Sequence, residues 1–503
     1  MLLPCIISQQ NLDENINQMF GNATGWFVDA MFAEIPITSS VGIPWVAVVL
    51  LLGASYFTVY FKFINFRSFY TAFQVVRGKY DVLEDKIKAQ DEVKDTNDIG
   101  EVSHFQALTT AVSATVGLGN IAGVAIALSI GGPGATFWMV VIGVLGMSSK
   151  FVECTLGVKY REIDENGRVF GGPMYYLTKG LKEKGYVRLG KVLSIFFAIM
   201  CIGGSFGGGN MFQVNQAFKL FDHVIVSENS MIHGQGWVFG LIMAILVGVV
   251  IIGGIKKIAS VTDKIVPFMV LTYIVTVFTV LILFRAEIPK ALIAIWEGVF
   301  YPQGVIGGFV GVLVQGLRRG AFSNEAGVGS ASIAHSAVKT RFPASEGLVA
   351  LLEPFIDTVI VCTMTALVLI ITGQISTGVA INDEQGVLLT ASALQSGVSW
   401  FPYLLTIAVM LFAFSSMISW SYYGYQAWSY LFGRGKQTEY VYKSIFCCFT
   451  VIGAAATLNS VTDFSDAMIF AMMVPNMIGL FLLSSKVKEE LIGYKQNISN
   501  LTK

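Results

Sequence analysis

The sequence is poor in charge. Only 13% of its 503 residues are Asp, Glu, Lys or Arg, about half of the ~25% that is usual in soluble domains, and this excludes an ordinary soluble enzyme. The 33 basic and 33 acidic residues balance, so the chain has no net basic field that could hold a nucleic-acid backbone. We therefore expect no nucleic acid among its partners.

Cysteine and histidine are scarce as well. The six cysteines are scattered, without CxxC spacing and without a histidine at metal-ligand spacing, which excludes a disulfide framework and a zinc site. The four histidines are unclustered along the chain, and no HExxH, GxSxG or Walker A motif occurs. These motifs mark common hydrolase and nucleotide sites. A membrane-embedded enzyme is therefore disfavoured, and we expect no enzymatic activity.

Long apolar runs dominate instead, since 54% of the residues are hydrophobic. A bilayer core requires about 20 apolar residues per helix, and the charge-free runs predict eleven spans in an all-α membrane protein. The run 105–149 is too long for one span, and the Gly-Gly-Pro-Gly turn at 131–134 divides it into two. The first span is placed at 41–63, the seventh at 305–338 and the eighth at 346–373.

The loops predict the orientation of these spans. Short loops rich in Lys and Arg remain in the cytoplasm, and here basic loops alternate with loops that have few or none. Residues 1–40 contain no Lys or Arg, whereas the tail 486–503 contains several. The pattern predicts a multi-pass protein of the cell membrane with an extracellular N-terminal segment and a cytoplasmic C-terminus.

Two segments place glycines and polar side chains where a membrane helix should be apolar. They are 113–120 in the second span and 324–330 in the seventh, and each contains Gly-x-Gly followed by a small polar residue. Because the spans are five helices apart, equivalent helices would run in opposite directions, as in the inverted repeats of transporters. We predict repeats at 101–285 and 305–485. For a single glycine pair, close helix packing would be the better explanation, but two matching breaks favour a binding site.

A broken helix provides the chemistry for such a site. Its severed ends expose N–H groups on one half and C=O groups on the other, and unwound backbone in a membrane must line a cavity or be buried in protein. A zwitterionic amino acid fits these ends, with its carboxylate at the half-helix that follows Gly119. Oxygen atoms between Ser113 and Asn120 suit sodium. A channel is less consistent, because pores require rings of like groups from several subunits.

Several longer motifs resemble one family. Residues 116–120 are similar to the unwound first core helix of neurotransmitter:sodium symporters. In order along residues 41–490, further motifs resemble the alanine/glycine:cation symporter family, within the amino acid-polyamine-organocation superfamily: 103–109, 117–123, 131–134, 171–176, 322–327, 353–358 and 420–424. The resemblance implies eleven helices with a ten-helix, leucine-transporter-like core of inverted repeats, broken at helices two and seven. It also implies import of alanine, glycine or a similarly small amino acid with sodium, or with protons in some members.

The resemblance also implies a pocket shared by spans two, four and nine. Asn210 and Gln213 lie three positions apart on span four, although helix–helix hydrogen bonding would explain them too. By resemblance, Trp420 forms a wall of the pocket. The predicted substrate residues are Thr115, Gly117, Leu118, Gly119, Asn120, Phe206, Asn210, Gln213, Ser416, Ser419 and Trp420. The predicted sodium ligands are Ser113, Val116, Asn120, Ser415 and Ser416.

One position departs from the family pattern, which usually has glycine where this chain has Ser419. The hydroxyl narrows the pocket slightly, so glycine, alanine and serine stay open as substrates and a bulky side chain is disfavoured. The oligomeric state, the stoichiometry and the tolerance for the D-enantiomer also stay open.

Charged residues inside predicted spans are functional hypotheses by default. We assign five of them to holding the break in span seven and to gating, rather than to direct substrate binding. Their signs suggest that they pair with one another, and Glu353 and Asp357 are expected to share a helix face. The set is Arg318, Arg319, Glu325, Glu353 and Asp357.

Overall fold

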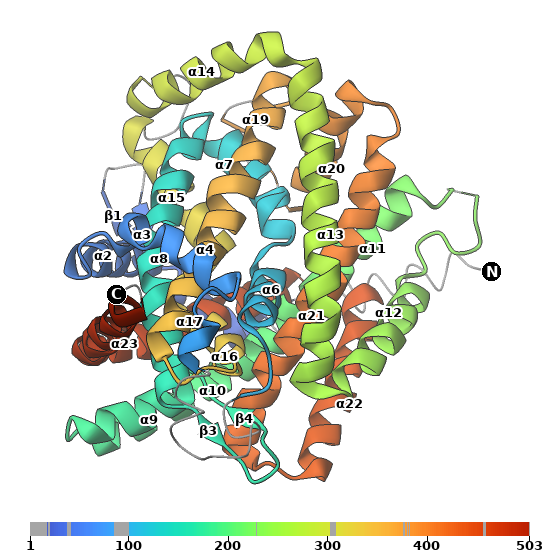
Figure 1. Cartoon of the computed structure of the whole chain (residues 1–503). Coiled ribbons are helices and arrows are strands. Elements are labelled where there is room, and N and C mark those ends of the chain that lie inside the picture. The colour runs from blue at the N-terminus through green and yellow to red at the C-terminus, as the bar shows by residue number, and fades with distance from the viewer. Residues whose placement is uncertain are drawn as a thin grey trace.

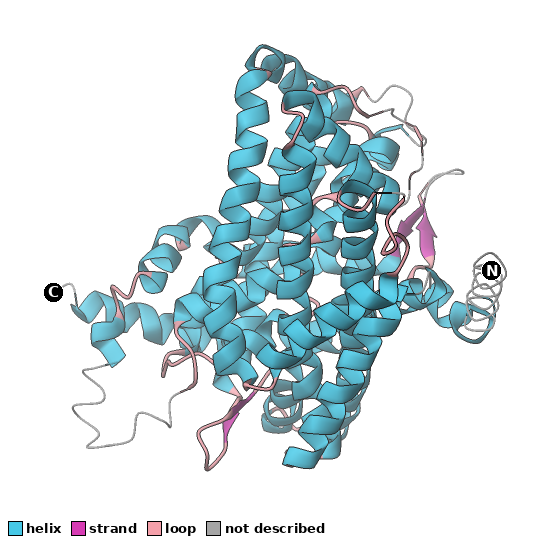
Figure 2. Cartoon of the chain, turned by 90° about the vertical axis from the view of Figure 1, so that its right-hand side faces the viewer, coloured by secondary structure: helices cyan, strands magenta, loops and turns pink. Residues whose placement is uncertain are grey.

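The computed structural model describes residues 18, 21–37, 42–84, 100–227, 229–301, 308–375, 378–379, 381, 383–455 and 459–501. Helices dominate this part of the chain, and most of the long ones run side by side along one direction (Figures 1 and 2). Two short antiparallel hairpins accompany them, namely β1 (Glu34–Pro36) with β2 (Gly42–Pro44), and β3 (Glu162–Ile163) with β4 (Val169–Phe170).

Six helical segments are each long and apolar enough to cross a membrane, and a bent pair makes up to seven. These six include α8 (Ala135–Lys159), α10 (Val187–Phe206) continued by η3 (Gly207–Met211) and α11 (Phe212–Val224), α13 (Gly254–Leu283), Pro343–Ile371, α21 (Phe401–Phe432) and Asp463–Leu501 within α23 (Asn459–Leu501). Pro343–Ile371 consists of α17 (Pro343–Ala350), α18 (Leu352–Pro354), η5 (Phe355–Cys362) and α19 (Thr363–Ile371). The protein is thus a multi-pass helical membrane protein, and the count of eleven stays a prediction.

The remaining elements are shorter or less apolar. These remaining elements are α2 (Trp45–Tyr60), α3 (Ile64–Arg67), α4 (Phe69–Val76), α9 (Pro173–Glu183), α12 (Gly236–Ile251), η4 (Arg285–Glu287), α14 (Ile288–Phe300), α20 (Asp383–Gly397) and α22 (Lys436–Ala455). With α2, α12 and α22 included, described helices overlap every one of the predicted spans.

The second predicted span is interrupted where the glycines lie. Helix α6 (His104–Thr115) begins at a capping box, in which Ser103 accepts a hydrogen bond from the Gln106 N–H and the Gln106 side chain returns one to Ser103. It ends because Val116 and Gly117 take extended backbone angles. The short turn η2 (Leu118–Asn120) and α7 (Ala122–Gly131) follow, and the chain bends by 61° across the break.

The seventh predicted span is interrupted as well. Helix α15 (Gly308–Asn324) ends at Asn324, and α16 (Ala331–His335) begins after the six residues 325–330. The intervening backbone is left-handed at Glu325 (φ 50°), Gly327 (φ 94°) and Gly329 (φ 101°). Glycine takes this conformation freely, whereas Glu325 takes it at a cost. Both interruptions therefore lie where the sequence predicts them.

Small residues bring the two breaks together. Helix α8 packs against α15, α16 and α17, while α21 packs against α6, α10 and α13. A side chain at Gly316 would place its Cβ 2.5 Å from the Ala135 carbonyl oxygen, so only glycine permits α15 to approach α8 this closely. The two broken helices thus meet in the interior, beside α21.

Candidate functional site

A cavity of about 110 Å³ lies where the two breaks meet. Its wall comes from both breaks, from the η3–α11 segment, from α21 and from α23. The lining residues are Ala114, Thr115, Gly117, Leu118, Gly119, Gly123, Gly208, Phe212, Gln213, Arg319, Phe322, Ser323, Glu325, Trp420, Asp466, Ile469 and Phe470. Both interrupted helices therefore line the same cavity, as the sequence predicts.

Six of the predicted substrate residues line this central cavity: Thr115, Gly117, Leu118, Gly119, Gln213 and Trp420. Trp420 is only 2% exposed and lies against Gly209, where a Cβ would come within 2.4 Å of the Trp420 side chain. Gln213 donates from Nε2 to the Gly208 carbonyl at 3.1 Å. Its buried Oε1 receives no hydrogen bond from the described residues, so an acceptor is left at the cavity wall.

Two predicted residues, Phe206 and Asn210, face a different helix. Asn210 donates to the Phe446 carbonyl at 2.7 Å and accepts from Thr450 Oγ1 at 2.8 Å, and both partners are on α22. Phe206 stacks on Tyr442 with ring centroids 5.4 Å apart. The reason is the wide π-type turn η3, which shifts the helical register. Asn210 and Gln213 therefore do not share the face that ordinary helical spacing predicts.

Four buried serines gather where α6 contacts α21. Ser416 Oγ donates to the Ser113 carbonyl at 2.8 Å, and Ser113 Oγ contacts the Ser415 carbonyl at 3.2 Å. Ser113 Oγ also hydrogen bonds with Ser419 Oγ. Val116 ends α6 one turn further along. Clustered hydroxyl and carbonyl oxygens are the ligands that a hard cation prefers. The structure thus brings Ser113, Ser415 and Ser416 together, and their role as sodium ligands stays a prediction.

Asn120 belongs to a second cluster. Its Oδ1 accepts from the Gly117 N–H at 2.7 Å, while its Nδ2 donates to Ser323 Oγ at 3.0 Å and to Asp357 Oδ1 at 2.7 Å. Asp357 also accepts from Ser323 Oγ and Thr358 Oγ1, both at 2.7 Å. The predicted sodium ligands are thus divided, and Asn120 connects the first break to the second through Asp357.

Comparison with known proteins places the chain in a family. The model of the sodium:alanine symporter family matches residues 27–503. The chain belongs to this family. It is 38% identical to the sodium/alanine symporter AgcS of Methanococcus maripaludis, over 93% of this chain and 98% of that protein. It is also 33% identical to the probable sodium/glutamine symporter GlnT of Bacillus subtilis, over 89% of this chain and 87% of that protein.

A solved structure shows the same fold. MhsT, crystallised in complex with L-phenylalanine, superposes with a TM-score of 0.52 at 16% identity, over 76% of this chain and 89% of that chain. Family membership and fold together make the protein a secondary transporter of amino acids and not an enzyme. The family resemblance that the sequence motifs indicate is confirmed.

The embedded charges of this symporter family member pair differently from the prediction. Glu353 accepts from Lys150 Nζ at 2.9 Å, and Lys150 is outside the predicted set. Asp357 instead accepts from the Asn120 amide at 2.7 Å. Arg319 and Glu325 line the central cavity, and Glu325 accepts from Ser330 Oγ at 2.8 Å. Arg318 lies 5.9 Å from the centre of the Phe322 ring.

The sequence analysis does not predict several buried polar residues of the interior. Among them, only Lys150 could have been found from the sequence, because it is a charged residue at the end of a charge-free run. His104 and His335, unclustered in the sequence, both bind the carboxylate of Glu346, and the His335 contact is 2.5 Å. The contributions of Asp466, Ile469 and Phe470 from α23 also had no sequence signal, because only tertiary packing brings α23 to the breaks.

Proposed function

We propose that the protein imports a small neutral amino acid, alanine, glycine or serine, together with sodium by alternating access. The observation that supports this most is the size and composition of the central cavity. At about 110 Å³ it has room for a small amino acid, and Trp420, Ile469 and Phe470 leave little space for a larger side chain. The name of one relative includes glutamine, so the wall of the cavity, rather than family membership, favours a small substrate.

The cavity offers complementary partners to a zwitterion. The unwound backbone at Gly117–Gly119 presents peptide groups to the carboxylate. Gln213 Oε1 is an acceptor without a donor among the described residues, and Glu325 supplies a negative charge at the same cavity. The substrate ammonium would satisfy both groups. Buried polar groups are stable only when they are paired, so the site favours a ligand that bears both charges.

Cation coupling follows from Asp357. This carboxylate is fully buried, and no Lys, Arg or His of the described residues forms an ion pair with it. A buried charge without a counter-ion is costly, and a neutral zwitterion does not provide one. Sodium bound near Asp357 and Asn120, or at the serine cluster of α6 and α21, would supply the missing positive charge. Protonation of Asp357 is the alternative, and it corresponds to proton coupling.

The two halves of the chain would then move against each other. We assign the halves to 101–285 and 305–485, each containing one broken helix, with the predicted extracellular N-terminus and cytoplasmic C-terminus. Asn120 joins both breaks through Ser323 and Asp357, so cation binding at Asp357 would act on both halves at once. This is a direct physical route from ion binding to the substrate cavity.

Uptake by proteoliposomes tests the proposal. We expect an inward sodium gradient to drive saturable accumulation of labelled alanine above its equilibrium level, with glycine and serine as competitors and leucine without effect. Accumulation driven by a proton gradient alone would favour the proton-coupled alternative. Movement only down the alanine gradient would contradict symport and indicate a channel.

A further inference from the structure

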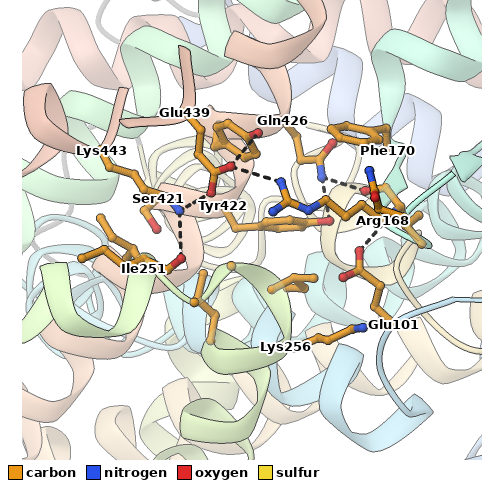
Figure 3. Close-up of a pocket in the computed structure, with 18 residues that line it drawn as sticks. Glu101, Arg168, Phe170, Ile251, Lys256, Ser421, Tyr422, Gln426, Glu439 and Lys443 are labelled. Carbon is orange, nitrogen blue, oxygen red and sulfur yellow. Dashed lines mark hydrogen bonds and ion pairs between the residues drawn. The ribbon is translucent and has the colours of Figure 1, made fainter. Parts of the chain in front are cut away.

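A second cavity, of about 250 Å³, lies at the end of the molecule that carries the β3–β4 hairpin. We call it the hairpin pocket. Figure 3 shows that its lining comes from separate parts of the chain: the residues before α6, the hairpin, the turn between α12 and α13, and the neighbouring parts of α21 and α22. The basic loops predict that this end faces the cytoplasm.

Helix α21 contributes to both cavities. Trp420 lines the central cavity, and the next two residues, Ser421 and Tyr422, line the hairpin pocket. Trp420 and Tyr422 are 2% and 4% exposed, so each cavity has a buried aromatic side chain of α21 in its wall.

Groups of both signs face the hairpin pocket (Figure 3). Arg168 Nη1 lies 3.1 Å from Glu439 Oε2, and Lys443 binds the same carboxylate. Glu101 Oε1 accepts from the Val169 N–H at 2.7 Å. The exposed Lys256 also lines the pocket and forms no hydrogen bond or ion pair with the described residues. The pocket therefore suits neither a simple anion nor a simple cation.

Gln426 provides the most specific feature. It is 2% exposed, and its Nε2 donates to the Val169 carbonyl at 2.9 Å and to Tyr422 OH at 2.8 Å. Because a carbonyl can only accept, the nitrogen must face Val169, and this fixes the direction of Oε1. Gln426 Oε1 is buried and receives no hydrogen bond from the described residues. A fixed, buried acceptor of this kind requires a donor.

We propose that the hairpin pocket binds a free amino acid. The ammonium donates to Gln426 Oε1 and faces Glu101, while the carboxylate faces Lys256 and Arg168. Phe170 and Ile255 offer apolar surface to the side chain. The larger volume admits more side chains than the central cavity does.

This assignment rests on the proposed function, because it takes its ligand class from the central cavity. It makes the hairpin pocket a holding site on the release side. When the pocket is filled from the cytoplasm, the bound amino acid occupies the release side and slows further import.

Equilibrium binding separates the two sites, since no proposed sodium ligand lies in the hairpin pocket. The full chain in lipid nanodiscs would be titrated with labelled alanine, with sodium and with choline in its place. We expect a sodium-dependent component from the central cavity and a weaker component that persists in choline. Gln426→Leu should weaken the choline component roughly tenfold or more, the size expected for losing a hydrogen bond to a charged group, and leave the sodium-dependent component intact.

Two further variants complete the design. Gln216→Leu is the matched control, because Gln216 is also buried, at 8% exposure, but lines a different cavity, and it should change neither component. Lys256→Gln tests the carboxylate side of the pocket. Lys256 forms no hydrogen bond or ion pair with the described residues, so the change should weaken only the choline component.

Two results would overturn the inference. One is wild-type protein with sodium-dependent binding and no binding in choline. The other is a choline component that both Gln426→Leu and Lys256→Gln leave unchanged. If the wild-type protein shows no sodium-dependent binding of alanine, the proposed symport is refuted instead. The failure of the further inference and the failure of the proposed function are thus distinguishable.

Discussion

Removing the Lys150 ammonium should destabilise the protein strongly. Lys150 and Glu353 are both fully buried, with Nζ 2.9 Å from Glu353 Oε1 and 3.7 Å from Glu153 Oε1. His335 Nε2 lies 3.8 Å from the other oxygen of Glu353. Lys150→Met keeps most of the side-chain volume and removes the charge, which leaves two buried carboxylates with His335 as the nearest basic group.

The magnitude follows from the burial. Removing one partner of a buried ion pair costs about 3–5 kcal/mol, because the other charge stays buried without compensation. This is a large share of the ~5–15 kcal/mol by which proteins are stable. The double variant Lys150→Met/Glu353→Leu should recover part of the loss, since an apolar replacement of a buried pair is often neutral, although Glu153 stays buried without its cation.

Lys159→Met is the matched control. Lys159 is also on α8 and pairs with Glu490, but the two side chains are 25% and 26% exposed, so its loss should cost less than about 1 kcal/mol. The assay is thermal unfolding of purified protein in one detergent, read as the midpoint and as the rate of inactivation. The reasoning is refuted if Lys150→Met unfolds no earlier than Lys159→Met, or if the double variant is no more stable than the single one.

Three further predictions concern the central cavity. Asp357→Asn should abolish the stimulation of alanine binding by sodium, because the buried negative charge is lost; stimulation equal to that of the wild type would contradict the assignment of Asp357. Gly209→Ala should push Trp420 into the cavity, since the new Cβ would lie 2.4 Å from that side chain, at a cost of about 1–3 kcal/mol. It should weaken alanine binding more than glycine binding, and an unchanged ratio in competition assays would speak against Trp420 as the limiting wall. Asn210→Leu should lower stability by about 1–3 kcal/mol, because the Phe446 carbonyl and the Thr450 hydroxyl each lose one of their hydrogen bonds, and should leave alanine affinity unchanged in the same binding assay. A loss of alanine affinity without a loss of protein stability would instead indicate that Asn210 contacts the substrate.

Local composition determined a large part of this protein. Charge-free runs predict apolar spans because hydrocarbon excludes charge, and the spans overlap described helices. The glycine-rich strings at 113–120 and 324–330 predict interruptions because glycine tolerates the extended and left-handed backbone that a break requires. Thr115, Gly117, Leu118 and Gly119 line the central cavity for the same reason, since they belong to the break itself. These properties depend on a few neighbouring residues, so the sequence alone determined them.

Tertiary structure decided which side chains meet. The π-type turn η3 shifts the register, so Asn210 turns to α22, although helical spacing predicts otherwise. Glu353 and Asp357 bind Lys150 and Asn120, which come from distant segments. Lys150 pairs with Glu353 because α8 packs against α18, and two histidines far apart in the chain share Glu346 because α6, α16 and α17 pack together. Regular spacing predicts a shared face only while the helix stays regular, and contacts between distant segments depend on packing that no local pattern records.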